Sequence, residues 1–110
     1  MKSILSCLAL ALLTAALPAV AADEGSAALE AIGKLNGIAL ACQQPALVTR
    51  ARNSVIAIAP KSRTAGETFE AATSAAFLEH GKGGVCPDAA TLAKDLAQAE
   101  KRLQAAFPSQ

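Results

Sequence analysis

Apolar residues recur at intervals of three and four along four segments of the chain, a spacing that predicts amphipathic helices. The segments run from about residue 26 to 43, from 45 to 59, from 64 to 80 and from 87 to 107. The connectors between them are short, which favours packing between consecutive helices. The expected fold is therefore all-α, either a small four-helix bundle or an orthogonal helical domain.

Polar residues and glycines predict where these helices begin and end. Ser26 can cap the first helix. Thr64 and Glu67 have the spacing of a capping box, in which each side chain accepts a hydrogen bond from the other residue's backbone amide. Gly81 is expected to take the left-handed conformation that ends the third helix. Asp88 places an anion at the positive end of the fourth helix.

Three small residues lie four apart in the first helix, at Gly33, Gly37 and Ala41, and so share one face. Each interior glycine costs about 1 kcal/mol of helix propensity relative to alanine. Close approach of another helix would compensate for this cost. Self-association through the first helix is a further interpretation of the same stripe, whereas Lys34 and Asn36 argue against a membrane-embedded one.

The first twenty-two residues have the pattern of a secretory signal peptide. Lys2 supplies a positive charge, residues 4–17 are mainly apolar, and small residues lead to a cleavage site near Ala21 or Ala22. No later apolar run is long enough to cross a membrane. We therefore expect residues 23–110 to form one helical domain in the periplasm or outside the cell.

The mature chain is electrically balanced and poor in aromatic residues. Removal of 22 residues leaves 88, in which nine Lys and Arg balance nine Asp and Glu. A nucleic-acid-binding domain usually shows a basic surplus, so this class is not expected. With three Phe and no Trp or Tyr, the core must come from aliphatic residues. A domain this small buries only about 60% of its unfolded surface, so an additional constraint is expected.

That constraint is predicted to be a disulfide. Cys7 is expected to leave with the signal peptide, so Cys42 and Cys86 remain. In an exported chain two cysteines pair by default. Closing a loop of about 45 residues contributes about 4 kcal/mol in the chain-entropy treatment. The bridge would join the end of the first helix to the start of the fourth.

The glycine-rich stretch at residues 80–84 invites three other interpretations, none of which its residues favour. A phosphate loop requires a preceding strand and a Ser or Thr after the lysine, and both are missing. A structural zinc site requires four ligands, while His80, Cys42 and Cys86 supply three. No Ser, His and Asp set lies in a recognisable motif. We therefore expect no metal, no cofactor and no catalytic site.

Without a catalytic constellation, binding to another macromolecule is the leading functional hypothesis. We expect a protein-binding role of inhibitor, immunity or envelope-assembly type, with another envelope or secreted protein as partner. The candidate binding residues are the cations around the connector between the second and third helices, namely Arg50, Arg52, Lys61 and Arg63. A purely solubilising role for these charges remains open, as does a small-ligand carrier function.

Two resemblances extend this hypothesis. A signal peptide, a short helical mature chain and two cysteines 44 residues apart resemble the layout of periplasmic acid-stress chaperones of the HdeA type. That resemblance implies opening in acid and binding of unfolded clients. Cys86, Pro87 and Asp88 open a segment that continues with Leu92, Leu96 and Leu103 and ends at Phe107 and Pro108. This segment resembles small helical immunity proteins of the Rap1a type, which neutralise cell-wall-degrading toxins. That similarity implies a fixed interface and one tight partner.

Overall fold

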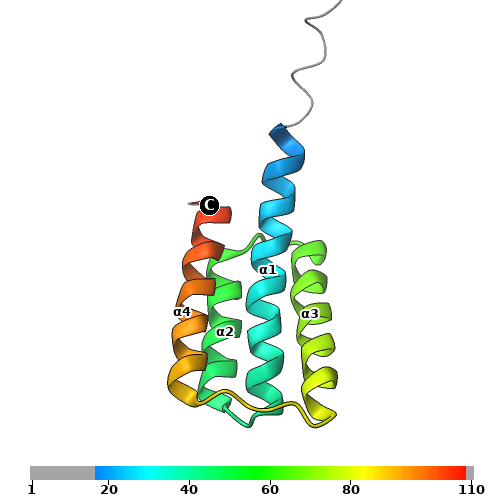
Figure 1. Cartoon of the computed structure of the whole chain (residues 1–110). Helices are drawn as coiled ribbons and strands as arrows, with labels where there is room; N and C mark the ends of the chain where they lie inside the picture. Colours follow the sequence, from blue (N-terminus) through cyan, green and yellow to red (C-terminus); the bar gives the residue numbers. More distant parts are fainter. Residues whose placement is uncertain (1–16, 109–110) are drawn as a thin grey trace, which may run out of the picture.

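The computed structural model describes residues 17–108, and this part of the chain is all-helical (Figure 1). Its four helices are α1 (Leu17–Ala41), α2 (Pro45–Ile58), α3 (Arg63–Gly81) and α4 (Ala89–Ala106). The predicted all-α fold with one disulfide is confirmed. The first sixteen residues, which hold most of the predicted signal peptide and Cys7, lie outside the described residues.

α1 is the central helix, and each of the other three packs against it. The chain runs alternately down and up the bundle, so α1 and α3 are parallel (Figure 1). α2 and α4 also pack against each other, on a side of α1 away from α3. Within residues 17–108, α1 is the only helix whose backbone packs against that of α3. A large part of the α3 circumference is therefore left without a neighbouring helix.

The core follows the predicted hydrophobic spacing. On α4 the apolar residues at helical spacing are buried at four positions, Leu92, Leu96, Ala99 and Leu103, and Ala106 in the last turn is partly buried. Leu96, Ala99 and Leu103 share a cluster with Leu29 and Ile32 of α1 and with Phe69 of α3, whereas Leu92 belongs to a second cluster with Ile38 and Ala76. On α2 only Ala51 is fully buried, with Leu47, Val55 and Ile58 partly buried around it. The core thus consists mainly of aliphatic side chains on α1 and α4.

Three predicted helix ends differ from the structure. α1 begins at Leu17 instead of Ser26, because the intervening residues contain no helix breaker after the first turn, where Pro18 is tolerated. Ser62, not Thr64, caps α3, and its hydroxyl accepts a hydrogen bond from the amide of Ala65 at 3.2 Å. The left-handed residue after α3 is Gly83, with φ of 103°, so Gly81 instead completes the helix.

One polar pair is buried between α1 and α3. The Asn36 side-chain amide donates a hydrogen bond to the Thr73 hydroxyl at 3.1 Å, and both residues are buried. The Thr73 hydroxyl lies 2.9 Å from the carbonyl oxygen of Phe69, to which it donates. The Asn36 Oδ1 atom has no hydrogen-bond partner among the described residues. This pair fixes one relative position of the two helices along their axes.

Candidate docking groove

α1 and α3 come into close contact along the small-residue stripe of α1. A Cβ atom on Gly33 would come within 2.8 Å of the Ala72 Cβ atom, and one on Gly37 within 2.8 Å of the Ala76 Cβ atom. Gly33 and Gly37 are therefore the residues that let α3 lie directly on α1. Ala41, at the end of the stripe, is half-buried. Gly33 and Gly37 face α3, so this part of the stripe packs within the protein, and self-association through the first helix stays a prediction.

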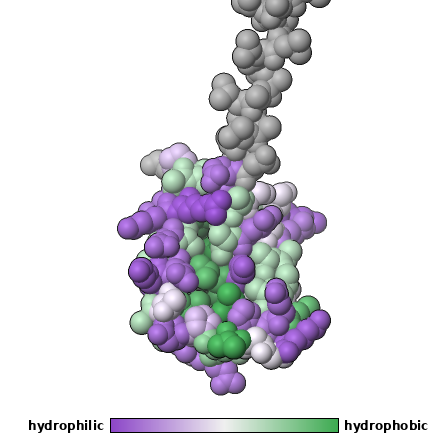
Figure 2. Space-filling model, in the orientation of Figure 1, coloured by the Kyte–Doolittle hydropathy of each residue, from purple (hydrophilic) through white to green (hydrophobic). Residues whose placement is uncertain are grey.

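Beside this contact a groove runs along α1 and α3, with about 670 Å³ of accessible space. Its floor is the flank of α3, where the side chains are small: Ala71, Ala72, Ala75 and Ala76. A run of alanines at these positions keeps the groove open, because a larger side chain there would fill it. On the face seen in Figure 2, a weakly hydrophobic strip covers much of α3 and hydrophilic side chains border it.

The rim of the groove is acidic. Glu30 and Lys34 line it from α1, and Glu67 and Glu79 line it from α3. No ion pair within residues 17–108 involves any of these four side chains, and all four residues are exposed. The rim therefore carries three carboxylates and one ammonium group. None of the three carboxylates forms an ion pair within residues 17–108.

The charges are unevenly distributed along the groove. Gly33 lies against Phe69 and Ala72, so Glu30, three residues earlier on the parallel helix α1, stands near the level of Glu67. These two carboxylates mark one end of the groove. Lys34 lies one turn farther on, and Glu79 lies at the opposite end of α3 from Glu67. From Glu67 to Glu79 the helix rises about 18 Å.

Exposed apolar side chains gather at the end of the bundle where α1 and α3 finish. Leu78 is 63% exposed and continues the surface of Ala71 and Ala75 at helical spacing. Val85, in the loop after α3, is 89% exposed. The lower end of the face in Figure 2 carries strongly hydrophobic surface where this loop crosses the bundle. The end of the groove that carries Glu79 thus also adjoins exposed apolar side chains.

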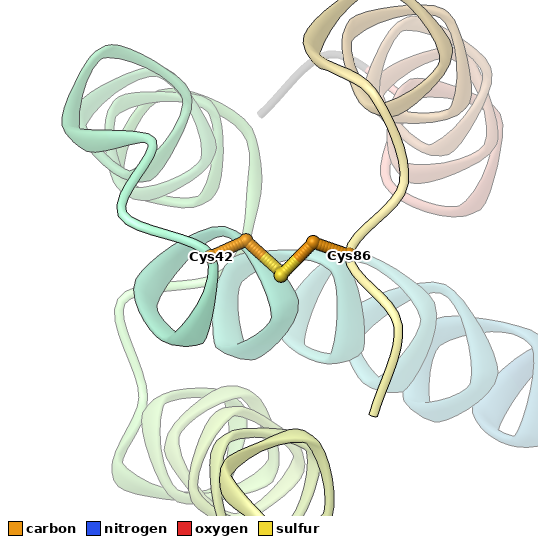
Figure 3. The surroundings of a disulfide bond; sticks show 2 residues. All are labelled: Cys42 and Cys86. Atoms are coloured by element: carbon orange, nitrogen blue, oxygen red, sulfur yellow. A yellow bond between two sulfur atoms is a disulfide. The ribbon is translucent and has the colours of Figure 1, made fainter. Parts of the chain in front are cut away.

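The disulfide closes this same end. Cys42 directly follows α1, and Cys86 lies in the segment that leads into α4 (Figure 3). Their sulfur atoms are 2.14 Å apart and their Cα atoms 5.7 Å apart. Cys86 is exposed and Cys42 is half-buried. The bridge therefore holds the loop after α3 against the end of α1 and sets the path of the chain beside the groove.

The four cations predicted to bind a partner do not form one cluster. Arg50 reaches α4, where its guanidinium makes an ion pair with Glu100 at 2.6 Å. Arg52 reaches α3 instead, with a 2.8 Å ion pair to Glu70 and its guanidinium 5.8 Å from the centre of the Phe69 ring. Two of the four candidates thus form ion pairs within the protein, one with α4 and the other with α3.

The other two predicted cations lie near the connector between α2 and α3. The Lys61 ammonium donates to the carbonyl oxygen of Ile56, and Arg63, the first residue of α3, is exposed. Arg50 and Arg52 thus link helices, whereas Lys61 and Arg63 lie at the connector. A partner-binding role for these four residues stays a prediction.

Glu100 is the carboxylate most strongly integrated into the structure. Partial burial raises its pKa, but hydrogen bonds from Arg50 and Ser54, together with the Arg50 charge, outweigh this and leave the pKa below its ordinary value. The same hydrogen bond raises the pKa of Arg50. At the start of α4, hydrogen bonding to the Thr91 side chain and to the Thr91 amide, the latter at 2.7 Å, lowers the pKa of Asp88. Both carboxylates are thus held in their charged form.

Residues beside the groove recur at helical spacing on α3. Glu67, Ala71, Ala75 and Leu78 lie at intervals of four and three, so they share one face. This spacing alone does not identify a groove, because the groove also requires α1 to lie alongside α3, and the local sequence does not reveal that contact.

Comparison of the chain with protein-family models, with curated proteins and with solved structures found no match. Within residues 17–108 no three His, Cys, Asp or Glu residues come together in a way that could hold a metal ion. No helix in that range combines the length and apolarity needed to cross a bilayer.

Proposed function

We propose that this protein is an exported module that binds another protein through the groove between α1 and α3 and does not act as a catalyst. The observation that carries the proposal is the groove itself, an alanine floor beside a rim whose three carboxylates form no ion pair among the described residues. An isolated surface carboxylate contributes little to binding, whereas several carboxylates arranged around an apolar groove favour the binding of one segment.

A rigid scaffold supports this use of the groove. Its two walls are held at van der Waals distance by Gly33 and Gly37, and the disulfide fixes the chain at one end. A preformed surface loses less conformational entropy on binding, which favours an inhibitor, immunity or assembly role with a fixed partner. The export itself rests on the predicted signal peptide and on the disulfide, which oxidising compartments favour.

The test is affinity capture from an envelope extract with the mature, oxidised protein as bait. A matched pair of variants separates groove binding from adsorption: Ala75→Phe fills the groove, and Ala105→Phe adds the same ring to an exposed position on α4. We expect one stoichiometric partner at pH 7 that Ala75→Phe loses and Ala105→Phe keeps. A partner retained equally by both variants would exclude the groove as the binding site.

Acid-stress chaperone activity is the second candidate, and Glu100 favours it. This carboxylate links α4 to Arg50 and Ser54 of α2, and its lowered pKa means that the link is lost when the pH falls far enough to protonate it. Opening there would expose the aliphatic core to unfolded clients. Binding of a hydrophobic-surface dye should then rise in acid, and a titration that stays flat down to about pH 2 would exclude the chaperone.

A further inference from the structure

We infer that the occupant of the groove is a cationic amphipathic helix, presented by an exported partner, with small residues on the face that enters the groove. This inference rests on the proposed protein-binding function and specifies the chemistry of the partner. The groove supplies three constraints on the occupant: its length, the size of the side chains that fit it and the sign of its charge.

The length follows from the span of α3 that lines the groove. Glu67 and Glu79 mark its two ends, about 18 Å apart along the helix axis. An α-helix of about twelve residues, slightly more than three turns, covers that distance. An extended strand would find no unpaired backbone groups to bond here, because both walls are helices.

The size of the entering side chains follows from the floor. Ala71 and Ala75 are exposed on α3 and offer only methyl groups to an incoming surface. Helices approach most closely when small residues face each other. Gly33 and Gly37 of α1 already show this where they pack against α3. An occupant with alanine, serine or glycine on its contact face would lie deepest. Leu78 at the far end provides a place for one larger apolar residue.

The charge follows from the rim. Glu30 and Glu67 face one end of the occupant and Glu79 faces the other, while Lys34 lies between them. Basic residues are therefore favoured near both ends of the bound helix and disfavoured near its middle. Arg50, Arg52 and Arg102 are poor candidates for that role in a second copy, since they already pair with carboxylates.

The test uses two synthetic helical peptides of fourteen residues titrated into the mature, oxidised protein. Both carry alanine along one face, and they differ only at the end positions, which are lysine in one and glutamate in the other. Binding is measured by the chemical shifts of backbone amides in α1 and α3 and by calorimetry. We expect the lysine peptide to bind, to perturb the groove and to weaken with added salt. The glutamate peptide should not bind.

Two matched pairs of variants locate the binding. Glu67→Gln combined with Glu79→Gln should weaken the lysine peptide about tenfold, since each exposed ion pair contributes modestly. Asp95→Asn, on the outer surface of α4, is the charge control and should leave affinity unchanged. Ala75→Phe should abolish binding, and Ala105→Phe should not. None of the five positions belongs to the core.

The outcomes distinguish this inference from the proposed function. Equal binding of both peptides, or lysine-peptide binding that survives Ala75→Phe, overturns the inference. A dimer of the protein that Ala75→Phe dissociates assigns the groove to a second copy and also overturns it. If neither peptide binds but envelope capture still yields a partner lost with Ala75→Phe, the cationic-helix inference fails while the protein-binding function stands.

Discussion

Gly37→Ala adds one methyl group at the point where α1 and α3 are closest. The new Cβ atom would meet the Ala76 Cβ atom and the Phe77 backbone nitrogen at 2.8 and 2.9 Å, and it would also press on the carbonyl oxygen of Thr73. Two of these three atoms belong to the α3 backbone, so a rotamer change cannot relieve the overlap. The helices must separate locally for the substitution to be accommodated.

The magnitude follows from two opposing effects. Alanine gains about 1 kcal/mol of helix propensity over glycine. Overpacking costs about 1–3 kcal/mol, and a clash with backbone belongs at the upper end of that range. The expected net loss is about 2 kcal/mol, which lowers the melting temperature of so small a domain by about 10 °C.

The assay is thermal and urea unfolding followed by circular dichroism, with Gly66→Ala as the matched control. A Cβ atom on Gly66 would meet no other group within 4 Å, and Gly66 lies inside α3. The control should therefore show the propensity gain alone, about 0.5–1 kcal/mol of added stability. If Gly37→Ala is as stable as the parent protein while Gly66→Ala gains stability, the close approach of α1 and α3 does not limit the side chain at residue 37, and the prediction is wrong.

Three further predictions concern the bonds that hold the helices together. Reducing the Cys42–Cys86 disulfide should lower the free energy of unfolding by about 4 kcal/mol, the chain-entropy value for its 44-residue separation, as measured by urea unfolding with and without reductant; a loss below about 1 kcal/mol would contradict it. Glu100→Gln should cost about 1 kcal/mol at pH 7, since the Arg50 side chain is 42% exposed and the ion pair is partly screened. Because the Glu100 pKa is lowered in the folded protein, this cost should shrink as the pH falls through that pKa, and a pH-independent difference would exclude the ion pair as its cause. Asn36→Asp would bury a charge and should cost about 3 kcal/mol or more at pH 7, with recovery in mild acid as the carboxylate protonates; unchanged stability in denaturant titrations would show that the site is hydrated.

The helices and the core were predictable because hydrophobic periodicity is local information. The α4 seam and the partly buried face of α2 follow directly from apolar residues spaced three and four apart. The disulfide was predictable from cysteine count and export alone, without any knowledge of geometry.

The groove was not predictable for a physical reason specific to alanine. Alanine is found in cores and on surfaces with similar ease, so Ala71 and Ala75 do not indicate on which side of α3 a neighbour lies. The ion pairs of the predicted cationic set were unpredictable for a different reason. Arg50 and Arg52 are two residues apart, but their partners lie 50 and 18 residues away on different helices. Only the tertiary arrangement separates them.

The attachment of α3 through α1 alone has a consequence for motion. α1, α2 and α4 pack against one another, so they can stay assembled when α3 leaves, whereas α3 has no second backbone neighbour within the described chain. Beyond α1, the ion pair and ring contact of Arg52 also hold it. Amide hydrogen exchange should therefore fall into two classes, with α3 exchanging through a partial opening of lower free energy and the other helices only through global unfolding. The disulfide just beyond α3 tethers the open helix near its site, so that reclosure is a local search within a short loop.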